Sequence, residues 1–189
     1  MIGSQESRRV MVLGVLALLL GGYTYATTPA QTRLASQTQQ EKLERPIFEF
    51  SAEKITHLEV MFDEQHLVGT RTAEGWKREQ NGELLPSAVV DDFLTALTKL
   101  VNLGNVEGQA GELSEYGLKP PKTQISLQVE GGGTQTLVLG KHNPVSTSLY
   151  ALVNQSPQVI LVGSVLSWDL RKLMDAAKSL EAAQQKTPS

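Results

Sequence analysis

The sequence contains no cysteine and no excess of basic residues, and each absence excludes a class of protein. Without cysteine the chain has no disulfide, no thiolate metal ligand, no cysteine nucleophile and no lipid-modified N-terminal cysteine. The formal net charge is −3, and no basic stripe runs along the chain, which argues against nucleic-acid binding. The folded part must therefore be stabilised by burial of apolar side chains alone.

One uncharged stretch near the N-terminus, residues 10–26, follows Arg8 and Arg9. As a helix it would span roughly 25 Å, near the lower limit for crossing the hydrocarbon core of a bilayer. The arginines predict a cytoplasmic N-terminus, and Tyr23 and Tyr25 would lie at the outer headgroups. We therefore predict a single-pass membrane anchor, with the C-terminal domain on the far side of the membrane from the cytoplasm.

The same stretch also fits a cleaved secretory signal, with Thr24 and Ala26 at the −3 and −1 positions of a cleavage site. Its apolar part is longer than the roughly 7–15 residues of a typical signal core, which favours the uncleaved anchor. Both alternatives export the same domain, and cleavage near Ala26 is left open.

The rest of the chain is predicted to be one tethered domain. Residues 1–9 form the cytoplasmic N-terminus, and residues 27–46, rich in Thr, Gln and Ala, form a linker or stalk. Residues 47–183 form the exported domain, and residues 184–189 form a tail. Residues 1–27 hold two basic residues and one acidic residue, so 15 basic and 19 acidic residues remain, a net charge of −4.

Hydrophobic periodicity predicts strands and then a helix, twice in succession. In the first half the pattern predicts strands at 55–63, 66–72 and 76–80 and a helix at 87–101, which Ser87 would cap. In the second half it predicts strands at 123–130, 134–140, 149–153 and 159–162 and a closing helix at 164–178. The predicted fold is α+β, with two related β-rich half-domains (about 47–104 and 112–183), each closed by a helix, which suggests an internal repeat.

Short motifs occur in a characteristic order along this domain. They are Ile-x-x-Leu-x-Val at 55–60, Gly75-Trp76, Tyr-Gly-Leu-x-Pro-Pro at 116–121, Leu-Val-Leu-Gly at 137–140 and Tyr150-Ala151. Over residues 47–173 the chain resembles the bacterial family catalogued as domain of unknown function 4340. That resemblance implies a membrane-anchored exported protein, often encoded beside ABC-transporter components and gliding-motility-type auxiliary proteins. It implies no catalytic residue, and it implies an accessory role in an envelope complex.

No catalytic, metal or cofactor site is predicted. The histidines His57, His66 and His142 lack metal-site spacing, although the first two could meet across a hairpin without a third ligand. The three glycines at 131–133 precede a strand, so they predict a hairpin turn and not a phosphate loop. No Gly-x-Ser-x-Gly motif is present. We therefore predict a protein that is not an enzyme.

Four residues are candidates for contact with a partner. Lys141, His142 and Asn143 are predicted to lie in a polar loop that binds an anion or a partner backbone, or that simply connects two strands. Trp168 falls beside the apolar stripe of the closing helix, so it either contacts another protein or packs at the rim of the core. Trp76, by contrast, follows a turn glycine and is predicted to fill the core or to cover the helix at 87–101.

These features predict a non-enzymatic accessory or structural subunit of an inner-membrane complex, associated with an ABC transporter and acting through protein–protein contacts. The alternative is a periplasmic module that binds a peptide, a glycan or a lipid. That alternative predicts a concave apolar pocket between the two halves.

Overall fold

The computed structural model of the protein describes residues 46–106 and 113–185. These residues belong to the second of two compact units of the chain, Leu43–Ser189. The predicted anchor at 10–26, the stalk before Pro46 and the last four residues of the tail lie outside the described residues. Within the described ranges, no helix is both long enough and apolar enough to cross a membrane.

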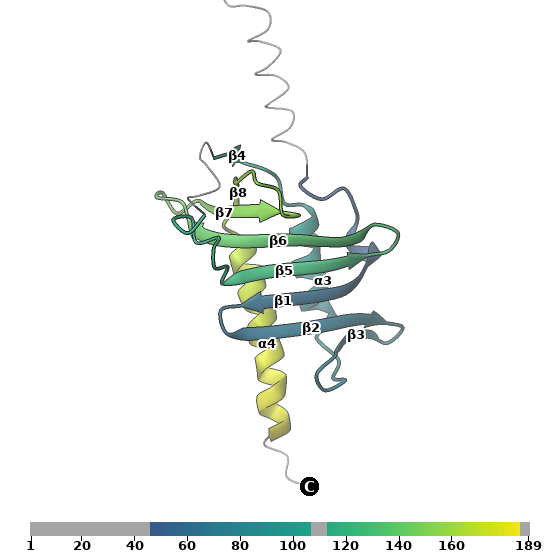
Figure 1. The fold of residues 1–189 in the computed structure, drawn as a ribbon. Helices are drawn as coiled ribbons and strands as arrows, with labels where there is room; N and C mark the ends of the chain where they lie inside the picture. Colours follow the sequence, from purple (N-terminus) through teal and green to yellow (C-terminus); the bar gives the residue numbers. More distant parts are fainter. Residues whose placement is uncertain (1–45, 107–112, 186–189) are drawn as a thin grey trace, which may run out of the picture. The chain divides into compact units, whose positions relative to one another are not determined.

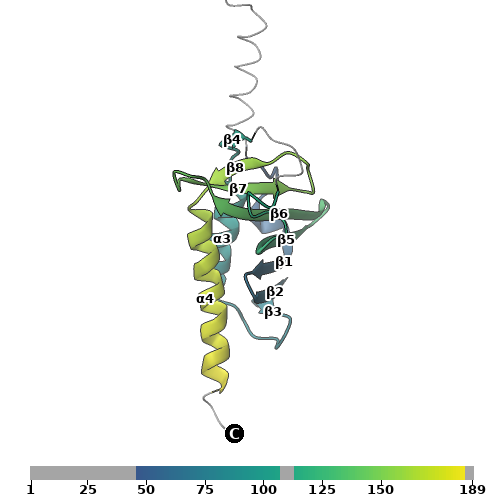
Figure 2. The same ribbon diagram turned by 60° about the vertical axis from the view of Figure 1, so that its left-hand side comes forward.

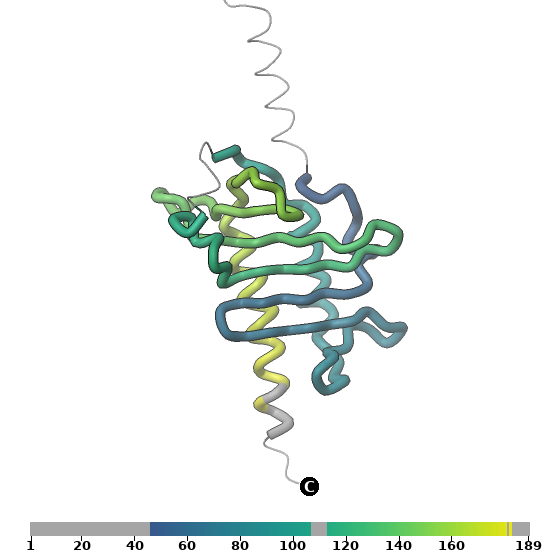
Figure 3. The backbone as a smooth tube through the Cα atoms, in the orientation of Figure 1, coloured from purple at the N-terminus to yellow at the C-terminus, as the bar shows by residue number. Residues whose placement is uncertain are grey.

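One antiparallel sheet of eight strands forms the frame of the domain (Figures 1 and 3). Its spatial order is β3-β2-β1-β5-β6-β7-β8-β4. The strands of the first half are β1 (Ile55–Phe62), β2 (Gln65–Thr72), β3 (Gly75–Arg78) and β4 (Gly104–Asn105), and a short 3-10 helix, η1 (Ala52–Lys54), precedes them. The strands of the second half are β5 (Thr123–Val129), β6 (Gly133–His142), β7 (Ser148–Val153) and β8 (Ile160–Gly163).

The predicted alternation of apolar and polar residues sets which face of the sheet is buried. In the central pair, Leu58 of β1 lies opposite Leu127 of β5, and Val60 lies opposite Ile125. All four side chains are buried. Because side chains alternate along a strand, the intervening polar residues are directed to the other face. The alternation of apolar and polar residues therefore decides which face of each strand packs against the core.

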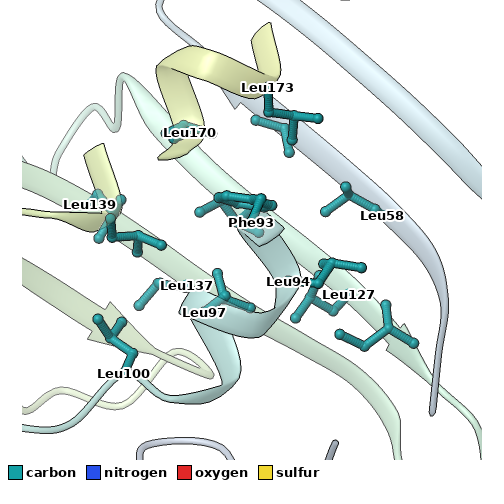
Figure 4. Packing of buried hydrophobic residues seen from close by; sticks show 14 of the residues in the cluster. Leu58, Phe93, Leu94, Leu97, Leu100, Leu127, Leu137, Leu139, Leu170 and Leu173 are labelled. Atoms are coloured by element: carbon teal, nitrogen blue, oxygen red, sulfur yellow. The ribbon is translucent and has the colours of Figure 1, made fainter. Parts of the chain in front are cut away.

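Both helices cover the same face of the sheet and lie against each other (Figure 2). Helix α3 (Ser87–Thr98) and helix α4 (Leu166–Gln185) each present an apolar stripe to the core. The buried residues of α3 are Val90, Phe93, Leu94 and Leu97, and those of α4 are Leu166, Leu170, Leu173, Met174 and Ala177. Figure 4 shows Phe93 between leucines of the sheet and of α4. One hydrophobic core therefore joins the two halves.

The start of α3 differs from its prediction. Pro86 occupies the N-cap position without a side-chain hydrogen bond, and Ser87 is the first helical residue. A Cβ atom added at Gly75 would lie 2.9 Å from the Ser87 hydroxyl oxygen, so this hydroxyl packs against the turn before β3 instead of capping the helix. Asp91 and Asp92 also lie beyond the first turn, and they pair with Arg71 (3.6 Å) and Lys172 (3.3 Å).

The end of α3 comes three residues before the predicted position, at Thr98. The chain then leaves the helix so that Leu100 enters the core and Val101 bridges to Pro46. Gly104 begins β4 and pairs with Leu161 of β8. The first half therefore adds an edge strand beside the last strand of the second half.

Substitution of Phe93 tests the shared core. Phe93→Ala should lower the free energy of unfolding by about 3–5 kcal/mol, because the ring is fully buried and its removal leaves a cavity. Thr95→Ala, on the exposed side of the same helix, should change it by less than about 0.5 kcal/mol. Urea unfolding of the two variants checks this, and a similar small loss in both would contradict the assignment of Phe93 to the core.

Candidate functional site

The motif Tyr-Gly-Leu lies at the end of a hydrogen-bonded turn at residues 113–117. The Leu118 amide donates to the Leu113 carbonyl (2.8 Å), and the Gly117 amide donates to the Ser114 carbonyl (3.1 Å). This pair of hydrogen bonds is the Schellman motif, and Gly117 has the left-handed φ of 71° that the motif requires. Leu118 is buried. Gly117 therefore closes the turn, and Leu118 packs back into the domain.

This turn docks on β6 through two glycines. The Lys141 amide donates to the Tyr116 carbonyl (2.8 Å), at a point where the pairing of β6 with β7 shifts register between Leu139 and His142. A Cβ atom on Gly140 would collide with the Tyr116 carbonyl oxygen, and one on Gly117 would lie 2.7 Å from the Lys141 Cγ. Close approach of the two segments therefore requires glycine at both positions.

A pocket of about 400 Å³ opens beside this contact. Its charged lining consists of Lys119, Lys122, Lys141 and Asp63. The three lysines are exposed, and none forms an ion pair with a carboxylate in the part of the chain that the structure describes. We call these four residues and the space between them the lysine pocket. It concentrates positive charge on an acidic domain.

Two of the four predicted contact residues, Lys141 and His142, lie at the end of β6 and not in a loop. The strand continues through His142, which pairs with Leu149, so the loop predicted to hold Lys141, His142 and Asn143 begins only at Asn143. Lys141 lines the lysine pocket, and the His142 side chain is exposed. The end predicted for β6 at residue 140 was wrong because the register shift lets Lys141 and His142 stay in the strand while the Lys141 amide donates to the Tyr116 carbonyl.

Asn143 holds the loop between β6 and β7 in place. Its side-chain oxygen accepts hydrogen bonds from the amides of Thr147 (3.0 Å) and Ser148 (3.1 Å). The backbone amide of Asn143 donates to the Ser148 carbonyl (2.8 Å). The side chain is committed to these internal bonds, so Asn143 shapes the loop.

The same loop meets the start of α4. The Ser164 amide donates to the Thr147 carbonyl (3.4 Å). We define the hairpin–helix junction as residues 143–147 and 164–168. Within the described chain, five large hydrophobic side chains are exposed, and three of them belong to this junction. They are Val145 (71%), Val165 (70%) and Trp168 (77%).

The two tryptophans have opposite environments. Trp76 is 2% exposed, and the Arg71 guanidinium lies 5.0 Å from its ring centroid. The prediction that Trp76 fills the core is confirmed. Trp168 lies on the exposed side of α4. Because most of its side chain is exposed, it does not pack at the rim of the core.

The histidines on the open face of the sheet do not form a metal site. His57 lies opposite Thr70, whereas His66 lies opposite Met61, so the register keeps the two rings apart. His57 contacts Glu79 (3.3 Å) and His66 contacts Glu59 (2.9 Å). Within the ranges that the structure describes, no group of three His, Asp or Glu residues is placed to hold a metal ion.

The arrangement around His57 also differs from a hydrolase triad. Its Nδ1 atom lies near both the Thr70 hydroxyl (3.1 Å) and the Glu79 carboxylate (3.3 Å). In a triad the hydroxyl and the carboxylate occupy opposite nitrogens of the ring, so that the ring can pass a proton between them. The Thr70 hydroxyl instead donates directly to Glu79 (2.6 Å).

Substitution of Gly140 tests the docking of the turn. Gly140→Ala should destabilise the domain by about 1–3 kcal/mol, because a backbone oxygen would have to move to admit the methyl group. Gly163→Ala is the matched control, since a Cβ atom there has no neighbour within 4 Å. Equal urea midpoints for the two variants would show that the turn does not pack on β6 as described.

Tryptophan fluorescence tests the two environments separately. Trp168→Phe should leave a blue-shifted emission that acrylamide quenches poorly, because only buried Trp76 remains. Trp76→Phe should leave a red-shifted emission that acrylamide quenches readily. Similar quenching in the two variants would mean that Trp168 is covered, and the junction would then not be a free surface.

Comparison with known proteins identifies one family. Neither the curated proteins nor the solved structures include a match to the chain. Residues 101–176 match the family described as domain of unknown function (DUF4340). The match includes Tyr116–Pro121, Leu137–Gly140 and Tyr150-Ala151, whereas Gly75-Trp76 lies before it. Over residues 101–176 the chain is similar to the DUF4340 family, and the family resemblance predicted from the sequence is confirmed.

Proposed function

We propose that this chain is a non-enzymatic accessory subunit of a bacterial inner-membrane complex. Residues 10–26 would anchor it, and the domain on the periplasmic side would contact another protein. The link to an ABC transporter rests on the family resemblance alone. One structural observation carries the proposal, which is the cluster of exposed apolar side chains at the hairpin–helix junction.

The composition of the junction fits a binding surface for a protein. Tryptophan is among the residues that contribute most to protein interfaces, and here Val165 lies one helical turn before Trp168. Val145 is on the loop that hydrogen bonds to Ser164. Scattered single hydrophobic residues need no explanation, but here three lie on two short segments that a backbone hydrogen bond joins.

The junction is also preorganised. Asn143 fixes the conformation of its loop, and the bond from Ser164 to Thr147 ties that loop to the helix. A surface that is already ordered loses less conformational entropy on binding. Apolar-ligand binding between the halves is less well supported, because β1 and β5 pair along their length where that pocket was predicted.

We also infer that the two halves descend from a repeated unit. Strands β1 and β5 are antiparallel neighbours at the centre, and each is followed outward by two further strands, β2 and β3 or β6 and β7. Helices α3 and α4 then return to the same face of the sheet (Figure 2). This order is the one that a two-fold axis through the central pair would give.

A photo-crosslinking experiment in native membranes tests the function. A photoreactive amino acid at position 168 of the full-length chain should give one discrete adduct on illumination. The same amino acid at position 128, an exposed glutamine on the open face of the sheet, should give none. Adducts at neither position, or the same adducts at both, would count against a partner at the junction.

Truncation of the tryptophan gives the quantitative version of this test. Trp168→Ala should weaken the captured complex by about 30-fold, because loss of a central interface tryptophan costs about 2 kcal/mol or more. Leu84→Ala, which removes an exposed leucine (48%) outside the junction, should leave the complex unchanged. Co-purification of the identified partner with each variant measures both effects, and equal retention would contradict the proposal.

A further inference from the structure

We propose that the lysine pocket binds the phosphate group of a phosphomonoester. This inference goes beyond the proposed function, since it uses a different surface and a different kind of ligand. It rests on the charge of the pocket, on the way the backbone fixes its lysines, and on its size.

The charge of the pocket is unbalanced. Lys119, Lys122 and Lys141 face a space whose lining includes one acidic residue, Asp63, so the formal charge is +2. No ion pair to another carboxylate of the described chain offsets it. Like charges held together repel one another, and a bound anion relieves that repulsion. A phosphomonoester carries a charge of about −1.5 to −2 at pH 7, which matches this site better than a single carboxylate does.

The lysines reach the pocket from two segments that backbone bonds hold together. Lys119 and Lys122 flank Pro120 and Pro121. Leu118 forms an isolated β-bridge with Pro121, which closes the turn that carries Lys119. The Lys122 carbonyl accepts from the Asp63 amide (2.7 Å), and the Lys141 amide donates to Tyr116 (2.8 Å). The bases of the side chains are therefore fixed, while their ammonium groups can adjust to the oxygens of a phosphate.

The chemistry and size of the pocket favour an organic phosphate. Lysine binds phosphate as a point charge with three donors, and a phosphate offers three terminal oxygens. A volume of about 400 Å³ falls within the range of small-molecule sites and exceeds the volume of inorganic phosphate. Pro120, which is exposed in the wall, gives the attached carbon skeleton an apolar surface.

Such a phosphate has two sources, a soluble metabolite or the headgroup of an anionic lipid. The full-length chain in phosphatidylcholine nanodiscs is therefore titrated with glycerol 3-phosphate by calorimetry. In a second arm, nanodiscs that contain phosphatidic acid replace the soluble probe, and ³¹P NMR follows the headgroup. Saturable binding in either arm supports the phosphate site, and the arm that responds identifies the source.

Matched variants separate a site from general attraction. Lys119→Gln/Lys122→Gln/Lys141→Gln should weaken binding at least tenfold, which corresponds to about 1.4 kcal/mol. Lys54→Gln/Lys99→Gln/Lys178→Gln removes the same charge from exposed positions elsewhere and should change affinity less than about twofold. Asp63→Asn should strengthen binding by about threefold, because it removes the negative charge from the pocket.

Two results would overturn the proposal. One is the absence of saturable binding in both arms. The other is an equal loss of affinity in the two triple variants, which would show that net charge alone attracts the phosphate. Because Asp63→Asn is expected to increase affinity, a folding defect cannot imitate its effect. Loss of the crosslink at position 168 would leave this result unaffected, so failure of the proposed function and failure of the phosphate site can be distinguished.

Discussion

The pairing of β1 with β5 is the contact on which the rest of the domain depends. It places side by side two strands that begin 68 residues apart in sequence, and it joins two outward strands on one side to four on the other. The apolar residues of both strands then face one pair of helices and one core. Without this pairing each half would have only a small sheet and a single helix, with too little buried surface for a stable domain.

Local patterns in the sequence predicted most of the elements, because the period of hydrophobic residues is set by the backbone itself. Leu58 and Val60 in β1 and Phe93 and Leu97 in α3 are buried as expected. The ends of elements were harder to predict. Ser87 had the side chain of a cap, but its position against Gly75 decided its role, and no local pattern contains that contact.

In the candidate site, too, features set by a local pattern were predicted, and features set by contacts between distant segments were not. Trp168 was recognised because a helical stripe has a defined angular width, so a residue outside it is visible from spacing alone. Lys119 and Lys122 were not predicted to be site residues, although the motif at 116–121, which contains Lys119 and precedes Lys122, was recognised as a family motif. Their connection to Lys141 depends on the docking of the Tyr116 carbonyl against a strand glycine. Asn143 was recognised as polar, but its bonds turn inward and support the loop.

The two margins of the sheet have a consequence for assembly. The outermost strands, β3 and β4, have four and two residues, and residues 83–85 already bond to the free side of β3 through Arg78 and Trp76. Among the described residues, these short margins leave few unpaired backbone groups, which disfavours extension of the sheet by a strand of another chain. Any partner must therefore recognise side chains, and the domain is protected from edge-to-edge aggregation with copies of itself.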